Sequence, residues 1–189
     1  MEILKLSSKN FKEMVKITVR TIKNGQVAIC PTDTVYGLVC DTLNKKAMIK
    51  LCKIKKRPKN KPIPIFVKDI KMAKKLAKID KKQEQFLKKV WPGKTTVVLK
   101  KKNKKGTVGL RIPNHKLLLN LVKQLNFPLT GTSANISGQP ASTKIKEILR
   151  QFEGQNYQPD LVLDDGDLRN SKPSTVIDLT IIPPKILRA

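Results

Sequence analysis

The stretch TTVVLKKKNKKGTVGLRI, Thr95–Ile112, decides the fold class of this chain. It holds two runs rich in β-branched residues, TTVVLK and TVGLRI, which predict two strands. The lysine-rich segment between them ends in glycine, which favours a turn. Strands that follow each other directly do not fit a sheet built only from βαβ units, so we expect a sheet with strands of both directions.

Helix and strand patterns alternate on both sides of this hairpin. Amphipathic helices are predicted at 8–24, 45–53, 69–77, 80–90, 114–125 and 143–152, and further strands at 26–30, 63–67, 127–133, 160–167, 174–179 and 184–189. Ser8, Asp69, Asp80 and Asn114 are the predicted helix caps, and Gly25 is a predicted helix stop. No repeat or low-complexity linker divides the chain, so we predict a single α/β domain, 1–189, with a mixed sheet flanked by helices.

Length and composition are those of a globular protein. With 189 residues and 39% hydrophobic content, the chain can bury a substantial core. No apolar run approaches the roughly 20 residues that cross a bilayer. Charges interrupt the N-terminal segment MEILKLSSKNFKE, which does not resemble a signal peptide. A cytoplasmic location is expected.

The cysteines do not indicate a metal site. Cys30, Cys40 and Cys52 are odd in number, no pair has C-x-x-C spacing, and the chain has one histidine. We expect reduced thiols that pack as small hydrophobic side chains. No bound metal is predicted from the residues.

The net charge of +26 points to a polyanionic partner, such as a nucleotide or nucleic acid. Lysine supplies most of this charge along the whole length, so the few arginines are more informative, because their planar fork suits phosphate and carboxylate. They are Arg20, Arg57, Arg111, Arg150, Arg169 and Arg188. Aromatic residues make up only 4% of the chain, which argues against a platform that stacks single-stranded bases.

Three polar segments are candidates for the site. KIKKRPKNKP, at 53–62, could be a solvated loop, a nucleic-acid contact or a grip on one small polyanion. CPTDTVYGLVCD, at 30–41, and LTGTSANISGQP, at 129–140, offer hydroxyls that could orient a ligand or satisfy turns. WPGKTT, at 91–96, is not a P-loop, because Lys88 stands where that motif needs glycine and a strand pattern follows.

Taken together, these segments resemble the YrdC family of threonylcarbamoyl-AMP synthases, in its short form without an extra C-terminal domain. PTDTVYGL, KKRPKNKP, WPGKTT, VGLRIP, TSANISG and PSTVIDL occur in the family's order and spacing over almost the whole chain. The resemblance implies a twisted mixed sheet flanked by helices, with an open basic cavity. The sequence departs from the family at Phe66, often histidine, at Lys94, usually proline, and at Val39, commonly glycine.

The resemblance also implies roles for individual residues. Lys55 and Arg57 would be the catalytic pair. The nucleotide-binding residues would be Lys55, Arg57, Lys61, Thr107, Ser133, Asn135 and Arg188, and the threonine-binding residues Thr34, Arg111 and Ser174. Among the residues outside these patterns, we expect Lys53, Lys56, Lys59, Arg20, Arg150 and Arg169 at the surface, and we expect His115 to be structural.

The implied reaction joins L-threonine, bicarbonate or CO2, and ATP into threonylcarbamoyl-AMP and pyrophosphate, with Mg²⁺ arriving on ATP. A TsaD-type transferase complex with TsaB- and TsaE-type subunits would then modify transfer RNA beside the anticodon. No membrane is implied. Two other readings stay open: a module that binds transfer RNA or double-stranded RNA without turnover, and an ATP-binding subunit that regulates a partner.

Overall fold

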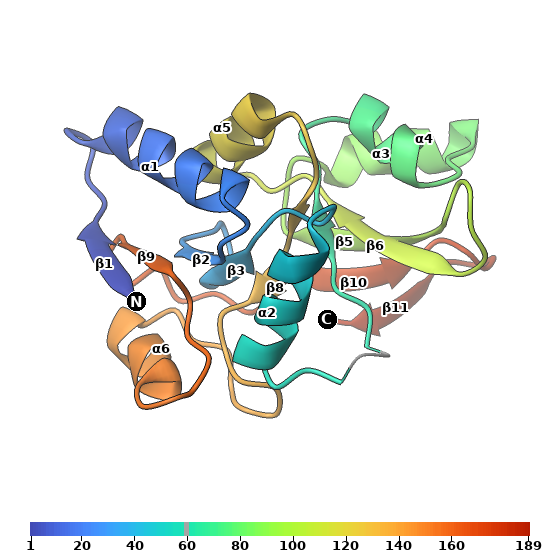
Figure 1. The fold of residues 1–189 in the computed structure, drawn as a ribbon. Helices are drawn as coiled ribbons and strands as arrows, with labels where there is room; N and C mark the ends of the chain where they lie inside the picture. Colours follow the sequence, from blue (N-terminus) through green and yellow to red (C-terminus); the bar gives the residue numbers. More distant parts are fainter. Residues whose placement is uncertain (59–60) are drawn as a thin grey trace.

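The computed structural model describes residues 1–58 and 61–189, which form two mixed sheets flanked by helices (Figure 1). The first sheet is five-stranded, in the order β1 (Glu2–Lys5), β9 (Leu161–Asp164), β2 (Ala28–Cys30), β3 (Gly37–Val39) and β8 (Thr132–Ser133). Its strands β1, β9 and β2 are parallel, whereas β3 is antiparallel to both β2 and β8. The predicted α/β class with strands of both directions is confirmed.

The second sheet is six-stranded and contains the hairpin predicted at Thr95–Ile112. Its order is β11 (Lys185–Arg188), β10 (Thr175–Asp178), β5 (Thr95–Lys100), β6 (Thr107–Arg111), β4 (Ile65–Phe66) and β7 (Leu129–Thr130). β5 and β6 are antiparallel, β10 is parallel to β5, and β4 is parallel to β6. The strands thus divide between two sheets, and β7 and β8 connect them through Gly131.

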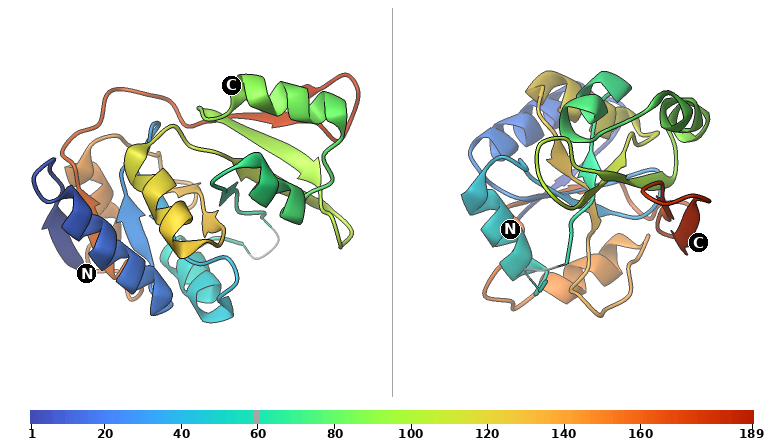
Figure 2. Two further views of the ribbon diagram at one scale, coloured as in Figure 1. Left: turned by 90° about the horizontal axis from the view of Figure 1, so that it is seen from above. Right: turned by 90° about the vertical axis from the view of Figure 1, so that its right-hand side faces the viewer.

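Helices cover both faces of the first sheet. The helices are α1 (Phe11–Lys23), α2 (Lys45–Ile54), α3 (Ile70–Leu76), α4 (Lys81–Val90), α5 (Lys116–Leu125) and α6 (Ile145–Phe152). Helices α1 and α5 pack side by side in one hydrophobic cluster, which α3 and α4 continue over the second sheet (Figure 2). Helices α2 and α6 belong to the other cluster.

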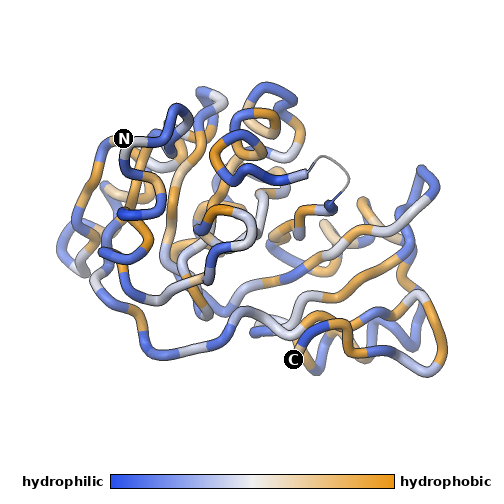
Figure 3. Tube along the Cα trace, turned by 90° about the horizontal axis from the view of Figure 1, so that it is seen from below, coloured by the Kyte–Doolittle hydropathy of each residue, from blue (hydrophilic) through white to orange (hydrophobic). Residues whose placement is uncertain are grey.

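Alternation along β2 and the residue before it, Val27, assigns side chains to the two hydrophobic clusters. Ala28 and Cys30 belong to the cluster under α1 and α5, while Val27 and Ile29 belong to the cluster with α2 and α6. This is the period of two expected when successive side chains point to opposite faces. Figure 3 shows hydrophobic strands inside and hydrophilic turns at the periphery.

The predicted caps Asp69 and Asp80 are confirmed. Asp69 accepts the backbone N–H of Met72 at 2.6 Å, and Asp80 forms a reciprocal capping box with Gln83. After Gly25, whose φ is +72°, the chain continues into β2, as predicted. The predicted length of α2 is also correct to within one residue.

Two other predicted caps are wrong. Asn10 occupies the N-cap of α1 in place of Ser8, and its side chain is held by Ser7. Helix α5 begins after His115, one residue later than predicted, and the backbone N–H of Asn114 donates to Asp33 Oδ2 at 2.9 Å. Asn114 therefore makes a tertiary contact just before the helix.

The strands β1 and β3 were not predicted from the pattern. β1 is mostly exposed and lacks apolar alternation. β3 is wholly buried, but it lies in a segment whose many polar residues do not form a strand pattern.

Among the described residues, no helix combines the length and hydrophobicity that a membrane span needs. The thiols Cys30 and Cys40 are free and buried, which confirms their role as small core side chains, and burial raises the pKa of Cys40 to about 12. Cys52 is also free but only partly buried.

Candidate functional site

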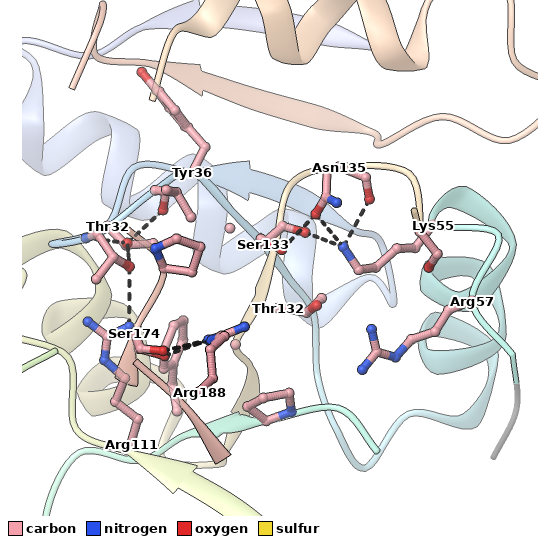
Figure 4. A pocket seen from close by; sticks show the side chains of 18 of the residues that line it. Thr32, Tyr36, Lys55, Arg57, Arg111, Thr132, Ser133, Asn135, Ser174 and Arg188 are labelled. Atoms are coloured by element: carbon pink, nitrogen blue, oxygen red, sulfur yellow. Dashed lines mark hydrogen bonds between the residues drawn. The ribbon is translucent and has the colours of Figure 1, made fainter. Parts of the chain in front are cut away.

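A cavity of about 240 Å³ lies where the two sheets meet (Figure 4). Its lining comes from β3 and β8 of the first sheet, from β4, β6 and β11 of the second, and from the loop after α2. The basic residues in this lining are Lys55, Arg57, Lys61, Arg111 and Arg188. The polar residues include Thr32, Thr34, Ser133, Asn135, Ser137 and Ser174.

This cavity brings together the predicted site residues except Thr107. Thr107 is exposed at the start of β6, beside a second hollow along the lysine-rich turn 100–106. Arg111 ends the same strand and faces the cavity. Four residues of extended chain separate the two by about 13 Å, so the strand carries them to different surfaces.

Arg111 is fixed at one end of the cavity by the protein itself. Its side chain is 4% exposed, and Nη2 donates to Asp33 Oδ1 at 2.6 Å. Nε donates to the carbonyl of Gly93 at 2.8 Å. Burial lowers the pKa of Arg111, and the neighbouring Asp33 counteracts part of that effect. The guanidinium is therefore held as a preorganised cation.

A group of hydroxyls surrounds this end. Thr34 Oγ1 lies 3.3 Å from Arg111 Nη1 and 3.0 Å from Thr32 Oγ1. Ser174 Oγ lies 2.9 Å from Thr96 Oγ1. Small hydroxyls beside a fixed cation can orient a ligand that carries both a carboxylate and a hydroxyl.

Arg188 approaches the same serine from the C-terminal strand. Its Nη2 donates to the carbonyl of Ser174 at 2.6 Å, and its Nε donates to the same oxygen at 3.0 Å. Burial lowers the pKa of Arg188, although the residue is exposed on one side. This contact places a second guanidinium at the rim of the cavity (Figure 4).

Phe66 and Gly131 close the wall beside Arg111. A Cβ on Gly131 would lie 2.8 Å from the ring of Phe66, so only glycine fits here without displacing that ring. Phe66 is 3% exposed, and its ring centroid lies 5.9 Å from Arg111 Cζ. Phe66, at a position that is often histidine in the family, therefore forms an apolar wall of the site.

Lys55, at the end of α2, is almost fully enclosed. Its Nζ donates to the Ser133 carbonyl at 2.6 Å, the Asn135 carbonyl at 2.9 Å and Asn135 Oδ1 at 2.7 Å (Figure 4). The residue is 2% exposed. Burial, followed by repulsion from Arg57 and Lys61, lowers the pKa of Lys55 to about 7.

Arg57, in the basic loop that follows α2, bonds to two backbone carbonyls further along the chain. Its Nε donates to the Lys61 carbonyl at 3.2 Å, and its Nη2 donates to the Pro62 carbonyl at 2.6 Å. The guanidinium points into the cavity (Figure 4), and partial burial lowers its pKa. Two backbone carbonyls thus hold the Arg57 guanidinium at the cavity.

The residues expected at the surface behave as predicted where the structure describes them. Lys53, Lys56, Arg20, Arg150 and Arg169 are exposed. Lys59 lies outside the described residues. His115 is half-buried at the start of α5, and burial lowers its pKa.

The sequence did not indicate the two partners of Arg111. Asp33 lies in the polar segment at 30–41 but was given no pairing, and the carbonyl of Gly93 was not considered. Ser137 belongs to the polar segment at 129–140, whose hydroxyls were candidate ligand contacts, and it lines the cavity. Nothing in the local pattern identifies a backbone carbonyl as the partner of a side chain many residues away.

Metal-binding side chains do not gather in the described part of the chain. Within 1–58 and 61–189, no group of three or more histidines, cysteines, aspartates or glutamates could hold a metal ion. The lining of the cavity, as far as the structure describes it, contains no carboxylate.

Comparison with known proteins places the site in context. The Sua5/YciO/YrdC family model, described as "Telomere recombination", matches residues 20–189. A Methanocaldococcus jannaschii protein named putative threonylcarbamoyl-AMP synthase is 36% identical, covering 94% of this chain and 86% of that protein. A Pyrococcus abyssi threonylcarbamoyl-AMP synthase is 34% identical, and the match spans 92% of this chain but only 53% of that protein.

Solved structures agree with this match. The crystal structure of P. abyssi Sua5 complexed with L-threonine has a TM-score of 0.86 and 32% identity, covering 99% of this chain and 56% of that one. The crystal structure of Escherichia coli YciO has a TM-score of 0.85 and 26% identity, covering 99% of this chain and 93% of that one. The chain is therefore similar to short and long proteins of one fold.

Proposed function

The chain belongs to the Sua5/YciO/YrdC family, and from that premise we propose that it is a threonylcarbamoyl-AMP synthase formed by one domain, 1–189. The reaction would join L-threonine, bicarbonate or CO2, and ATP into threonylcarbamoyl-AMP and pyrophosphate. One observation carries the proposal: cations and hydroxyls from both sheets line one cavity.

The cavity has two chemically different ends, which suit the two substrates. Arg57 and Lys61 on the basic loop, with Ser133 and Asn135 on the facing turn, would form the nucleotide end. Arg offers bidentate contacts to phosphate, and ATP carries several negative charges. Lys55 would contribute its buried positive charge to this end. Thr107 could contact only a nucleotide group that extends out of the cavity.

The amino-acid end would be formed by Arg111, Thr34 and Ser174. Arg111 is already paired with Asp33, so we assign the substrate carboxylate to its remaining donors on Nη1. Thr34 and Ser174 would orient the amino and hydroxyl groups of threonine. Arg188 would link this end to the nucleotide, because it bonds Ser174 and lines the same cavity.

The proposed chemistry needs orientation and charge more than acid–base groups. The neutral amine of threonine attacks the carbon of CO2, which bicarbonate supplies by losing hydroxide, and the nitrogen gives up a proton as the carbamate forms. A carbamate oxygen then attacks the α-phosphorus of ATP, and the bond to the bridging oxygen breaks to release pyrophosphate. Fixed cations would stabilise the charge that develops on the transferring and leaving groups. Mg²⁺ would be carried by the triphosphate.

A second candidate function rests on the exposed lysines. Lys78, Lys100, Lys101, Lys102, Lys104 and Lys105 line the hollow at the β5–β6 turn, away from the cavity. With a net charge of +26, this surface could bind transfer RNA or double-stranded RNA through phosphates. Such binding would fit a product that is passed to a TsaD-type complex for modification of transfer RNA.

The decisive experiment incubates the purified chain with ATP, bicarbonate and one amino acid at a time, and measures pyrophosphate. We expect threonine-dependent release, and a preference over serine of about 10- to 200-fold, which is the range that one methyl group provides. Release that is independent of the amino acid, or absent while RNA binding is strong and sensitive to salt, would reject the synthase in favour of the RNA-binding module.

The low pKa of Lys55 gives a testable pH dependence. Burial and the charges of Arg57 and Lys61 destabilise its ammonium in the free protein, whereas a bound polyanion would stabilise it. Binding ATP should therefore take up a proton, so affinity should fall as pH rises above about 7. Each unit by which binding raises the pKa corresponds to about tenfold in affinity. Calorimetric titration between pH 7 and pH 9 measures this, and Lys55→Met should flatten the profile.

A further inference from the structure

All three hydrogen-bond donors of the Lys55 ammonium are already paired with acceptors of the protein. An ammonium group has three N–H donors. The Ser133 carbonyl, the Asn135 carbonyl and Asn135 Oδ1 accept from Nζ at 2.6 to 2.9 Å. A phosphate oxygen could bond to this group only by displacing one of these buried acceptors, and an unpaired buried acceptor is costly.

The backbone of Lys55 joins the same turn. Its carbonyl accepts the N–H of Ser137 at 2.8 Å. Side chain and main chain of one residue therefore tie the C-terminal end of α2 to the turn 133–137. This turn contributes Ser133, Asn135 and Ser137 to the cavity lining.

Asn135 is the centre of the turn. Its Oδ1 accepts from Lys55 Nζ and from Ser133 Oγ, the latter at 2.6 Å. Its Nδ2 donates to the carbonyls of Ile136 and Gln139. Loss of the Lys55 ammonium would leave Ser133, Asn135 and the turn without their shared donor. By contrast, Arg57 bonds only to carbonyls of its own loop among the described residues.

We propose that Lys55 is a positioning residue: its enclosed ammonium holds the 133–137 turn in its ligand-binding form and does not itself touch the phosphates. Direct phosphate contact falls to Arg57 and Lys61, whose side chains are accessible from the cavity. This inference rests on the proposed nucleotide end of the site. It refines that proposal by giving Lys55 the role of shaping the pocket, and Arg57 and Lys61 the role of binding the ligand.

The test is run at about pH 6, below the pKa of Lys55, so that its ammonium is protonated. It measures amide hydrogen exchange at 133–138 in the nucleotide-free protein and calorimetric affinity for ATP and inorganic pyrophosphate. Lys55→Met should accelerate exchange in the turn at least about tenfold, because the local opening equilibrium loses the bonds of Nζ. It should weaken ATP binding by about tenfold. Lys53→Met is the matched control, since Lys53 lies on the same helix, is exposed and bonds only the hydroxyl of Tyr157 among the described residues.

A double-mutant cycle separates the two roles further. If Lys55 acts through the turn, Asn135→Ala should weaken ATP binding less in the Lys55→Met background than in the wild type, whereas Lys61→Met should weaken it by the same factor in both. Should Lys55→Met fail to fold, Asn135→Ala alone tests the same contact: accelerated exchange of the turn supports the proposal, and unchanged exchange rejects it.

Two results would overturn the inference. One is weaker ATP binding by Lys55→Met with exchange of the turn at the wild-type rate, which means direct contact. The other is wild-type exchange and wild-type affinity together, which means no role. Exchange is read without ligand or turnover, so it decides the role of Lys55 even if the wild-type protein forms no pyrophosphate, an outcome that rejects only the proposed function.

Discussion

Arg57→Ala is expected to reduce kcat/KM for threonine-dependent pyrophosphate formation by at least about 100-fold, the loss typical when one preorganised donor to a developing charge is removed. Arg57 is the guanidinium that the basic loop points into the cavity. Its bonds to the carbonyls of Lys61 and Pro62 are local, so the free energy of unfolding should fall by less than about 1 kcal/mol.

Two matched variants sharpen this prediction. Arg20→Ala removes an exposed arginine from α1 and should leave the rate unchanged. Arg57→Lys keeps the charge but loses the fork, so it should restore only part of the activity. Steady-state pyrophosphate release and urea denaturation measure the two effects. Near-normal turnover by folded Arg57→Ala would refute the assignment of the phosphate end.

Arg111→Ala should have the largest effect on stability. The change leaves the Asp33 carboxylate, whose side chain is 9% exposed, without its cation, and leaves the Gly93 carbonyl without its donor. Breaking a buried ion pair from one side costs about 3–5 kcal/mol. Urea or thermal unfolding measures this loss, and the folded fraction should show no threonine-dependent turnover.

The double variant Arg111→Met with Asp33→Asn separates two effects of Arg111→Ala. One is the cost of leaving the Asp33 carboxylate buried without a counter-charge, and the other is the loss of the contact between Arg111 and the substrate. Because the double variant removes both charges, it should recover much of the stability lost by Arg111→Ala, while activity stays absent. Lys144→Ala, which breaks an exposed pair with Glu147, should cost less than about 1 kcal/mol. A loss of that small size for Arg111→Ala would show that the Asp33 pair is not stabilising, and recovered activity in the double variant would contradict the carboxylate role of Arg111.

Local sequence determined the features that depend on neighbours in the chain. The hairpin of β5 and β6 follows from two β-branched runs around a turn, and α3 and α4 begin at Asp69 and Asp80, whose side chains cap the next few N–H groups. The order of motifs predicted the family. Residues expected to share a site also lie in one cavity, except Thr107 at the far end of its strand.

Tertiary structure alone decided how those residues are used. Asp33 lies 78 residues from Arg111 and Lys55 lies 80 residues from Asn135, so no local pattern indicates either pairing. The same holds for the division into two sheets and for the contact between Asp33 and the backbone N–H of Asn114. Sequence specifies which donors and charges a segment carries, but burial assigns their partners, because only in the folded chain must each enclosed polar group find an acceptor or a counter-charge.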